Sequence, residues 1–286
     1  MSVQADLARW REHLTRFAAL LGNPPDAQAP ALAQTPAPAP QVLVFAPHPD
    51  DECIVGALPL RLQREAGWRV TNVAVTLGSH AERRAARWAE LQDACAVLGF
   101  GCVRPTPEGL SDVRADTAER APTLWAAHVQ AIAALLQEYR PALVLAPHER
   151  DDNPTHRGVY RLVLDALAAA GSDTVLAQTE FWSTQAAPNA LVQTGIADTA
   201  TLITALERHT GEIARNPYHL RLPAFLADAV RRGGELVNGA GEAPPDFAFA
   251  TLYRLQTVQA GRPGADLPRR IFPAREALNP DTLLTP

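Results

Sequence analysis

Two short segments carry histidines and carboxylates at a spacing that could bind a metal ion. Residues 46–52 read Ala-Pro-His-Pro-Asp-Asp-Glu, and residues 147–156 hold His148 and His156 around a pair of aspartates. Imidazole nitrogens and carboxylate oxygens are zinc ligands, and two histidines with one carboxylate leave a coordination position open for water. A closed structural zinc site would more typically use four cysteine or histidine ligands. The residue types therefore indicate metal-assisted hydrolysis.

Each of these segments follows a short apolar run that is typical of a buried strand. The pattern predicts strands over 42–45, 69–76, 102–104, 142–146 and 174–178, and helices over 52–65, 81–98, 121–139 and 157–170. Strands that alternate with helices form right-handed βαβ units. We therefore expect an α/β fold, a Rossmann-like, mostly parallel sheet with helices on both faces. In the common order 3-2-1-4-5 the first and fourth strands are neighbours, and ligands bind at their carboxyl ends.

The rest of the chain divides by composition. Residues 1–22 form an amphipathic helix whose apolar face holds Leu7, Trp10, Leu14, Phe17 and Leu21. We expect this helix to dock either on its own domain or on a neighbouring chain, which would give a homo-oligomer. Residues 23–40 are a linker rich in proline and alanine, 41–255 the catalytic domain, and 256–286 a proline-rich tail that wraps the surface.

Composition excludes several classes of function. The chain has 286 residues and no lysine, so its 26 basic residues are all arginine, against 31 acidic ones. Schiff-base chemistry and the lysine of a phosphate-binding P-loop are therefore excluded. The net charge of −5 does not favour nucleic acid or an anionic membrane. No GxGxxG motif follows the first strand, which argues against a dinucleotide. Without an apolar span or a secretory leader, we expect a cytoplasmic protein.

The two segments resemble a known family. APHPDDE, followed about 100 residues later by NPTHRG, is similar to the LmbE or PIG-L family of zinc-dependent N-deacetylases, whose motifs are (A/P)HPDDE and HPDH. The resemblance covers roughly 41–170 and includes Arg87-x-x-Glu90. It implies an LmbE-like deacetylase fold with one Zn²⁺ per chain. It also implies that His48, Asp51 and His156 are the metal ligands and that Asp50 is the general base.

The chemistry of the residues is consistent with these roles, because a carboxylate beside a zinc-activated water can take its proton during attack on an amide. The second motif, however, departs from the family pattern. Asn153 replaces its first histidine, and asparagine can donate a hydrogen bond to an oxyanion but cannot supply a proton. His148 is our candidate for that missing acid or oxyanion group. The alternatives are that His148 supports a ligand, is a plain loop histidine, or ligates the metal in place of His156.

Several other polar residues have two readings. Glu52 would either orient His48 or open a helix, where a carboxylate favours the N-terminal dipole. Arg87 would either bind substrate hydroxyls, as the family resemblance suggests, or pair with Glu90 on a helix surface. Glu180, before Phe181 and Trp182, would either line the sugar-binding mouth or end an ordinary strand. Asp151 and Asp152 are expected to cap the loop or the following helix, although one of them could bond a ligating histidine. Surface or core positions are expected for the remaining histidines, with a substrate role as the alternative for the last of them: His13, His80, His128, His209 and His219.

We therefore expect a zinc-dependent N-deacetylase that acts on a small N-acetylated molecule. The preferred substrate, an N-acetylglucosamine-type sugar or conjugate, follows from the family resemblance alone. A hydrolase of another amide or acyl group is the first alternative. A non-catalytic metal-binding protein with the same fold is the second, and Asn153 keeps it open.

Overall fold

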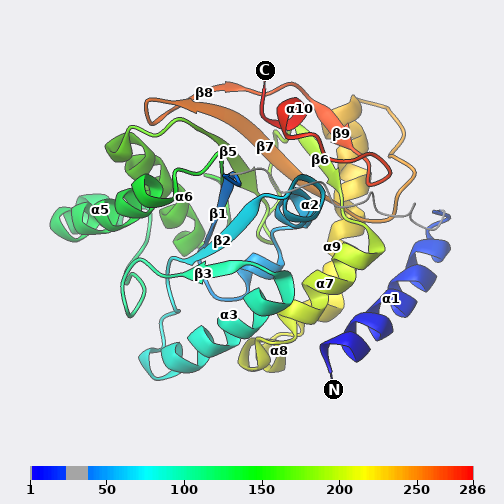
Figure 1. The fold of residues 1–286 in the computed structure, drawn as a ribbon, viewed down its shortest axis with the longest axis horizontal. Helices are drawn as coiled ribbons and strands as arrows, with labels where there is room; N and C mark the ends of the chain where they lie inside the picture. The colour runs from blue at the N-terminus through cyan, green and yellow to red at the C-terminus, as the bar shows by residue number, and fades with distance from the viewer. Residues whose placement is uncertain (1, 24–37, 286) are drawn as a thin grey trace.

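The computed structural model describes residues 2–23 and 38–285. Within that part of the chain, nine strands form one mixed sheet in the order β3-β2-β1-β4-β5-β7-β6-β9, with β8 paired to β7 (Figure 1). The strands are β1 (Gln41–Ala46), β2 (Arg69–Ala74), β3 (Gly101–Val103), β4 (Leu143–Ala146), β5 (Thr174–Thr179), β6 (Ala190–Gln193), β7 (Ala250–Gln259), β8 (Arg262–Asp266) and β9 (Arg270–Phe272).

The first five strands are parallel and follow the expected order. The α/β prediction is confirmed, because β1 and β4 are neighbours and their carboxyl ends meet at one edge of the sheet. The strand β7 was not predicted. It runs antiparallel to both β5 and β6. The expected boundary between the catalytic domain and the C-terminal tail, at residues 255 and 256, falls inside this strand. Two further strands, β8 and β9, follow that boundary in the same sheet.

Helices cover both faces of the sheet (Figure 1). Alternate residues of β1 explain this, because Val42 and Val44 face one apolar core while Leu43 and Phe45 face the other. The helices are α1 (Val3–Leu20), α2 (Ala57–Ala66), α3 (Arg84–Leu98), α4 (Thr117–Arg120), α5 (Pro122–Tyr139), α6 (Pro154–Ala170), α7 (Ile196–Leu206), α8 (Thr210–Arg215), α9 (Tyr218–Gly233) and α10 (Pro280–Leu284). Cores form between the sheet and α5 with α6 on one face, and between the sheet and α2, α3 and α7 on the other.

The helix expected over 52–65 begins later than predicted. Residues Asp51–Cys53 form a separate 3-10 turn, η1, and α2 starts at Ala57. Gly56 lies between them at φ +80°, where a Cβ atom would come within 2.0 Å of the Thr251 hydroxyl oxygen. Glycine is required there because the chain must pass closely over β7 before it can enter the helix.

The N-terminal helix docks on its own chain, against α7. Trp10 and Leu14 are buried at this contact, and Asp6 forms an ion pair with Arg208 at 2.6 Å. The expectation for Leu21 was wrong, because α1 ends at Leu20 and the Leu21 side chain is exposed. Most of the expected linker, 24–37, lies outside the described residues. None of the helices described is long and apolar enough to cross a membrane.

Candidate metal centre

The first motif forms a tight turn directly after β1. The Asp51 N–H donates to the His48 carbonyl oxygen at 3.3 Å, which closes a four-residue turn with Pro49 in its second position. Asp50 occupies the third position at φ +123° and ψ −27°. Turns of this kind favour glycine or asparagine there, and a residue held in such a sparsely populated region costs about 1–3 kcal/mol. The turn also folds the Asp51 carboxylate back, so that its Oδ2 accepts from the His48 N–H at 2.9 Å.

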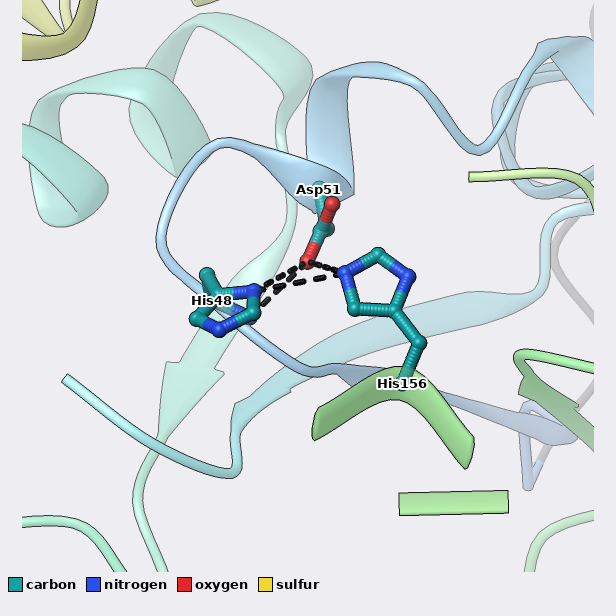
Figure 2. Close-up of side chains that lie close together, drawn as sticks. All are labelled: His48, Asp51 and His156. Atoms are coloured by element: carbon teal, nitrogen blue, oxygen red, sulfur yellow. Dashed lines mark hydrogen bonds and ion pairs between the residues drawn. The ribbon is translucent and has the colours of Figure 1, made fainter. Parts of the chain in front are cut away.

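Three side chains from the two motifs converge on one point (Figure 2). His48 Nδ1 lies 3.4 Å from Asp51 Oδ2, and His156 Nε2 lies 3.3 Å from each of these two atoms. A tetrahedral zinc ion bound at about 2.0–2.1 Å holds its nitrogen and oxygen ligands about 3.3–3.4 Å apart. The three atoms therefore already have the separations that such an ion requires, and the donor set fits zinc.

A fourth residue, Asp151, orients the His156 ring toward the other two candidate ligands. His156 lies in the first turn of α6, and its Nδ1 is 2.9 Å from Asp151 Oδ2. This contact favours a proton on Nδ1 and directs Nε2 at His48 and Asp51. The structure thus selects the reading in which Asp151 bonds the ligating histidine.

The electrostatics separate the two adjacent aspartates. Burial and the neighbouring charge of Asp51 raise the pKa of Asp50 well above its usual value, although His209 and Arg87 act in the opposite direction. Burial also opposes ionisation of Asp51, but His156 and His48 hold the pKa of Asp51 below its usual range. For His156, burial lowers the pKa while Asp51 and Asp151 raise it to about 10. Asp51 is thus the ionised partner of the histidines, whereas the Asp50 carboxyl group holds a proton more readily than an exposed aspartate does.

A second group of possible ligands lies behind the turn. Glu52, Cys53 and His209 are completely buried, and their side-chain ligand atoms lie close together. Glu52 Oε1, however, is 2.6 Å from His209 Nε2 and 3.1 Å from Cys53 Sγ. Ligand atoms around one zinc ion would lie farther apart than 2.6 Å, so these contacts are hydrogen bonds within a closed cluster.

The three-ligand group lies in a cleft of about 1060 Å³. Ligand pockets typically measure roughly 300–1,000 Å³, so a sugar-sized molecule fits. Asp50 and Asn153 line the cleft beside the metal group, and Phe181, Trp182 and Tyr218 give it an aromatic side. The ring centroids of Trp182 and Tyr218 are 5.4 Å apart. The cleft therefore combines the candidate metal ligands with aromatic side chains.

The comparison with protein families gives the same assignment as the motifs. Residues 43–167 match the model described as "PIG-L: GlcNAc-PI de-N-acetylase". These residues, somewhat less than half of the chain, are similar to the PIG-L family. Both motifs of the metal group lie inside the matched segment. A search of curated proteins finds no significant match.

Solved structures share the fold of this chain. An N,N'-diacetylchitobiose deacetylase from Pyrococcus horikoshii has a TM-score of 0.56 at 17% identity, over 80% of this chain and 87% of that chain. The zinc-inhibited form of a teicoplanin deacetylase has a TM-score of 0.54 at 14% identity, over 76% and 98%. A 4-carboxy-2-hydroxymuconate hydratase from Pseudomonas putida KT2440 has a TM-score of 0.55 at 16% identity, over 76% and 95%. Since one of these is a hydratase, the fold does not decide the reaction.

Asn153 and His148 both lie in the matched segment, but in different environments. Asn153 is the N-cap of α6, and its Oδ1 accepts from the Thr155 N–H at 2.9 Å, which leaves the side-chain NH₂ at the cleft as a donor. His148 is buried, and its Nε2 lies 2.9 Å from the Ser183 carbonyl oxygen. His148 is absent from the described lining of the cleft and from the three-ligand group. The expected role of His148 as acid or oxyanion group is therefore corrected, because its Nε2 bonds the loop after β5 and not the cleft.

Arg87 and Glu90 do not form the surface ion pair that their spacing allowed. Arg87 donates to the Pro49 carbonyl oxygen at 2.8 Å and lines the cleft. Glu90 accepts from the Thr210 hydroxyl at 2.7 Å and from the Gly211 N–H at 3.1 Å. One helix, α3, therefore holds both the metal-binding turn and the segment that begins α8. A direct contact of Arg87 with substrate stays a prediction.

The expectation that Glu180 binds substrate is wrong. Its side chain is fully buried and forms two hydrogen bonds with Arg232, at 2.9 and 2.6 Å. It is not among the residues described as lining the cleft, whereas the next two, Phe181 and Trp182, are. The strand end thus supplies aromatic rings to the cleft, and its carboxylate is used for packing.

The expectation for Glu52 changes, whereas His209 occupies a core position, one of the two that were expected. Glu52 contacts His209 and the Asp50 main chain, where the sequence suggested His48 or a helix dipole. His209 had no neighbouring motif, and its partner lies 157 residues away. The one available signal was Glu52 itself, because a carboxylate in the turn after a buried strand must find a partner if it is also buried.

Proposed function

We propose that this protein is a zinc-dependent N-deacetylase that releases acetate from a small N-acetylated molecule. The observation that carries the proposal is the three-ligand group with a carboxyl group beside it that does not ligate. His48, Asp51 and His156 have the separations of a zinc site, and Asp50 lines the same cleft without belonging to that group. The family match over both motifs supports this reaction class.

Each of these residues has a separate role in amide hydrolysis. His48, Asp51 and His156 would hold the metal, and a bound zinc ion would supply Lewis acidity toward water and toward the amide carbonyl. Asp50 takes the proton of the attacking water and returns it to the departing amine nitrogen. Burial and the Asp51 charge raise the pKa of Asp50, which makes its carboxylate a stronger proton acceptor than an exposed aspartate. The Asn153 side-chain NH₂ donates to the carbonyl oxygen as negative charge develops there.

We further propose an N-acetylglucosamine-type sugar or conjugate as the substrate. The Trp182 and Tyr218 rings give the cleft an apolar side against which a pyranose ring can pack. The deacetylases with a similar fold act, by their names, on diacetylchitobiose and on teicoplanin. The amine portion of the substrate lies outside the metal chemistry, so another amide or acyl substrate is the alternative to be tested.

The test is a screen for released acetate with N-acetylated sugars, amino acids and polyamines, using the zinc-loaded protein. Asp50→Asn is the matched control, because it keeps the shape of the side chain and leaves the three ligands in place. We expect acetate release from an N-acetylated sugar, and a loss of at least about 10²-fold in kcat for the variant with zinc still bound. Wild-type activity in Asp50→Asn would show that the base is elsewhere. Zinc binding without acetate release from any compound would favour the non-catalytic alternative.

A further inference from the structure

The main chain at Asp50 is held in a conformation that aspartate rarely adopts. Its φ of +123° lies in the region that favours glycine, yet the residue carries the carboxyl group next to the metal ligands. Such conformations persist only where surrounding contacts enforce them. The question is therefore which contacts hold Asp50 in place.

Glu52 provides one of these contacts. The side chain is completely buried, and its Oε2 accepts from the Asp50 main-chain N–H at 3.0 Å. Its other oxygen, Oε1, lies 2.6 Å from His209 Nε2 and 3.1 Å from Cys53 Sγ. Both carboxylate oxygens are thus occupied. One bonds the strained residue and the other is anchored by a histidine from a distant part of the chain.

His209 is itself fixed from several sides. It is completely buried, and its main-chain N–H donates to the Leu206 carbonyl oxygen at 3.1 Å, at the end of α7. Glu90 of α3 holds the next two residues through the Thr210 hydroxyl and the Gly211 N–H. Arg87, one turn earlier on α3, bonds the Pro49 carbonyl oxygen. The helix α3 therefore fixes the turn and the histidine relative to one another.

We propose that Glu52 and His209 are a positioning pair that holds the main chain of Asp50, so that its carboxyl group reaches the water to be activated. This inference rests on the proposed function. Neither residue is among those described as lining the cleft, and neither belongs to the three-ligand group. Loss of the pair should therefore reduce turnover through Asp50, with substrate affinity and zinc content preserved.

The variants use the length of the side chain at position 209. Glutamine can reach Glu52 with its NH₂ group, whereas asparagine is too short to do so. We expect His209→Asn to lower kcat by about tenfold to hundredfold, because small misplacements of a reacting group have effects of that size. KM should stay within about twofold, one zinc should remain per chain, and His209→Gln should recover most of kcat. Glu65→Gln is the matched control, because Glu65 is a buried carboxylate paired with Arg61 and does not line the described cleft.

A second measurement does not depend on activity. In Glu52→Ala, amide hydrogen exchange in a peptide that covers residues 48–53 should rise at least tenfold, because the Asp50 N–H loses its acceptor. Three results would each overturn the proposed positioning role of Glu52 and His209. They are unchanged exchange in Glu52→Ala, unchanged kcat in His209→Asn, and an equal loss of kcat in Glu65→Gln. Loss of zinc in parallel with kcat would also overturn it, since the effect would then act through the ligands. Failure of the proposed function gives a different result, because the wild-type protein would release no acetate while the exchange result could still hold.

Discussion

Replacing Glu180 by glutamine tests whether this residue serves packing or substrate binding. Its carboxylate is fully buried and forms a two-point contact with the Arg232 guanidinium. Oε1 also accepts from the Gln185 N–H at 2.7 Å. Arg232 has a second partner, Asp228, at 2.9 Å. The change Glu180→Gln keeps the shape of the side chain and removes its charge.

The expected cost follows from burial. Removing one partner of a buried ion pair costs about 3–5 kcal/mol, because the other charge loses its compensation. Asp228 still faces Arg232, and the glutamine oxygen can still accept from Gln185, so we expect the lower end, about 3 kcal/mol. For a domain of this size, each kcal/mol corresponds to about 2–4 °C in Tm, which predicts a decrease of about 6–12 °C.

Two measurements decide the matter. Urea unfolding, followed by tryptophan fluorescence, gives the loss of stability, and acetate release at a temperature where both proteins are folded gives kcat/KM. We expect kcat/KM within about twofold of wild type, because Glu180 lies outside the described lining of the cleft. Asp228→Asn is the control, since this partner is partly exposed and should cost less than about 1 kcal/mol. Full stability with a tenfold loss of kcat/KM in Glu180→Gln would refute the packing role.

The remaining predictions concern the metal group. Asp151→Asn should weaken zinc binding by about 10–100-fold, because Asp151 is the acceptor for His156 Nδ1. Competition with a chromogenic chelator measures the Kd for zinc, and an unchanged Kd would show that Asp151 does not support the binding of zinc by His156. Asn153→Asp should keep the cap of α6, since an oxygen still faces the Thr155 N–H, but should lower kcat/KM by about 10²-fold because the amide donor is gone. Asn153→Ala should lose the donor and, in addition, about 1 kcal/mol of stability from the cap. Equal turnover in the wild type and Asn153→Asp would exclude this donor from the reaction.

The parallel half of the sheet could be predicted because its signals are local. The apolar runs before His48 and His148 mark β1 and β4, and the helices between them fix the usual crossover order. The second half carries weaker signals. β7 contains the polar residues Thr251, Arg254 and Gln256 among its apolar ones, and it enters the sheet between β5 and β6, which precede it in the chain. Only the completed sheet shows that an antiparallel strand fits there.

The candidate metal ligands could be predicted from the sequence for the same reason. His48 and Asp51 lie in one turn, and His156 begins the helix after a strand that pairs with β1, so sequence motif and topology bring them together. The roles of Glu52 and Glu180 could not be predicted from the sequence. The partner of Glu52, His209, lies between α7 and α8, and the partner of Glu180, Arg232, lies in α9; neither segment carries a motif.

Buried charge explains where the sequence-based expectations failed. Spacing along a helix or turn suggests a partner three or four residues away, as it did for Arg87 with Glu90. A charge that is buried on folding must instead be compensated by whichever group the fold brings to it, because the cost of leaving it unpaired exceeds any gain from local spacing. Arg87 accordingly lies 3.7 Å from a Glu212 carboxylate oxygen and also donates to the Pro49 carbonyl oxygen, and Glu52 bonds the imidazole of His209. The candidate metal ligands can thus be predicted from local motifs, whereas the residues that hold them in position depend on contacts between distant segments.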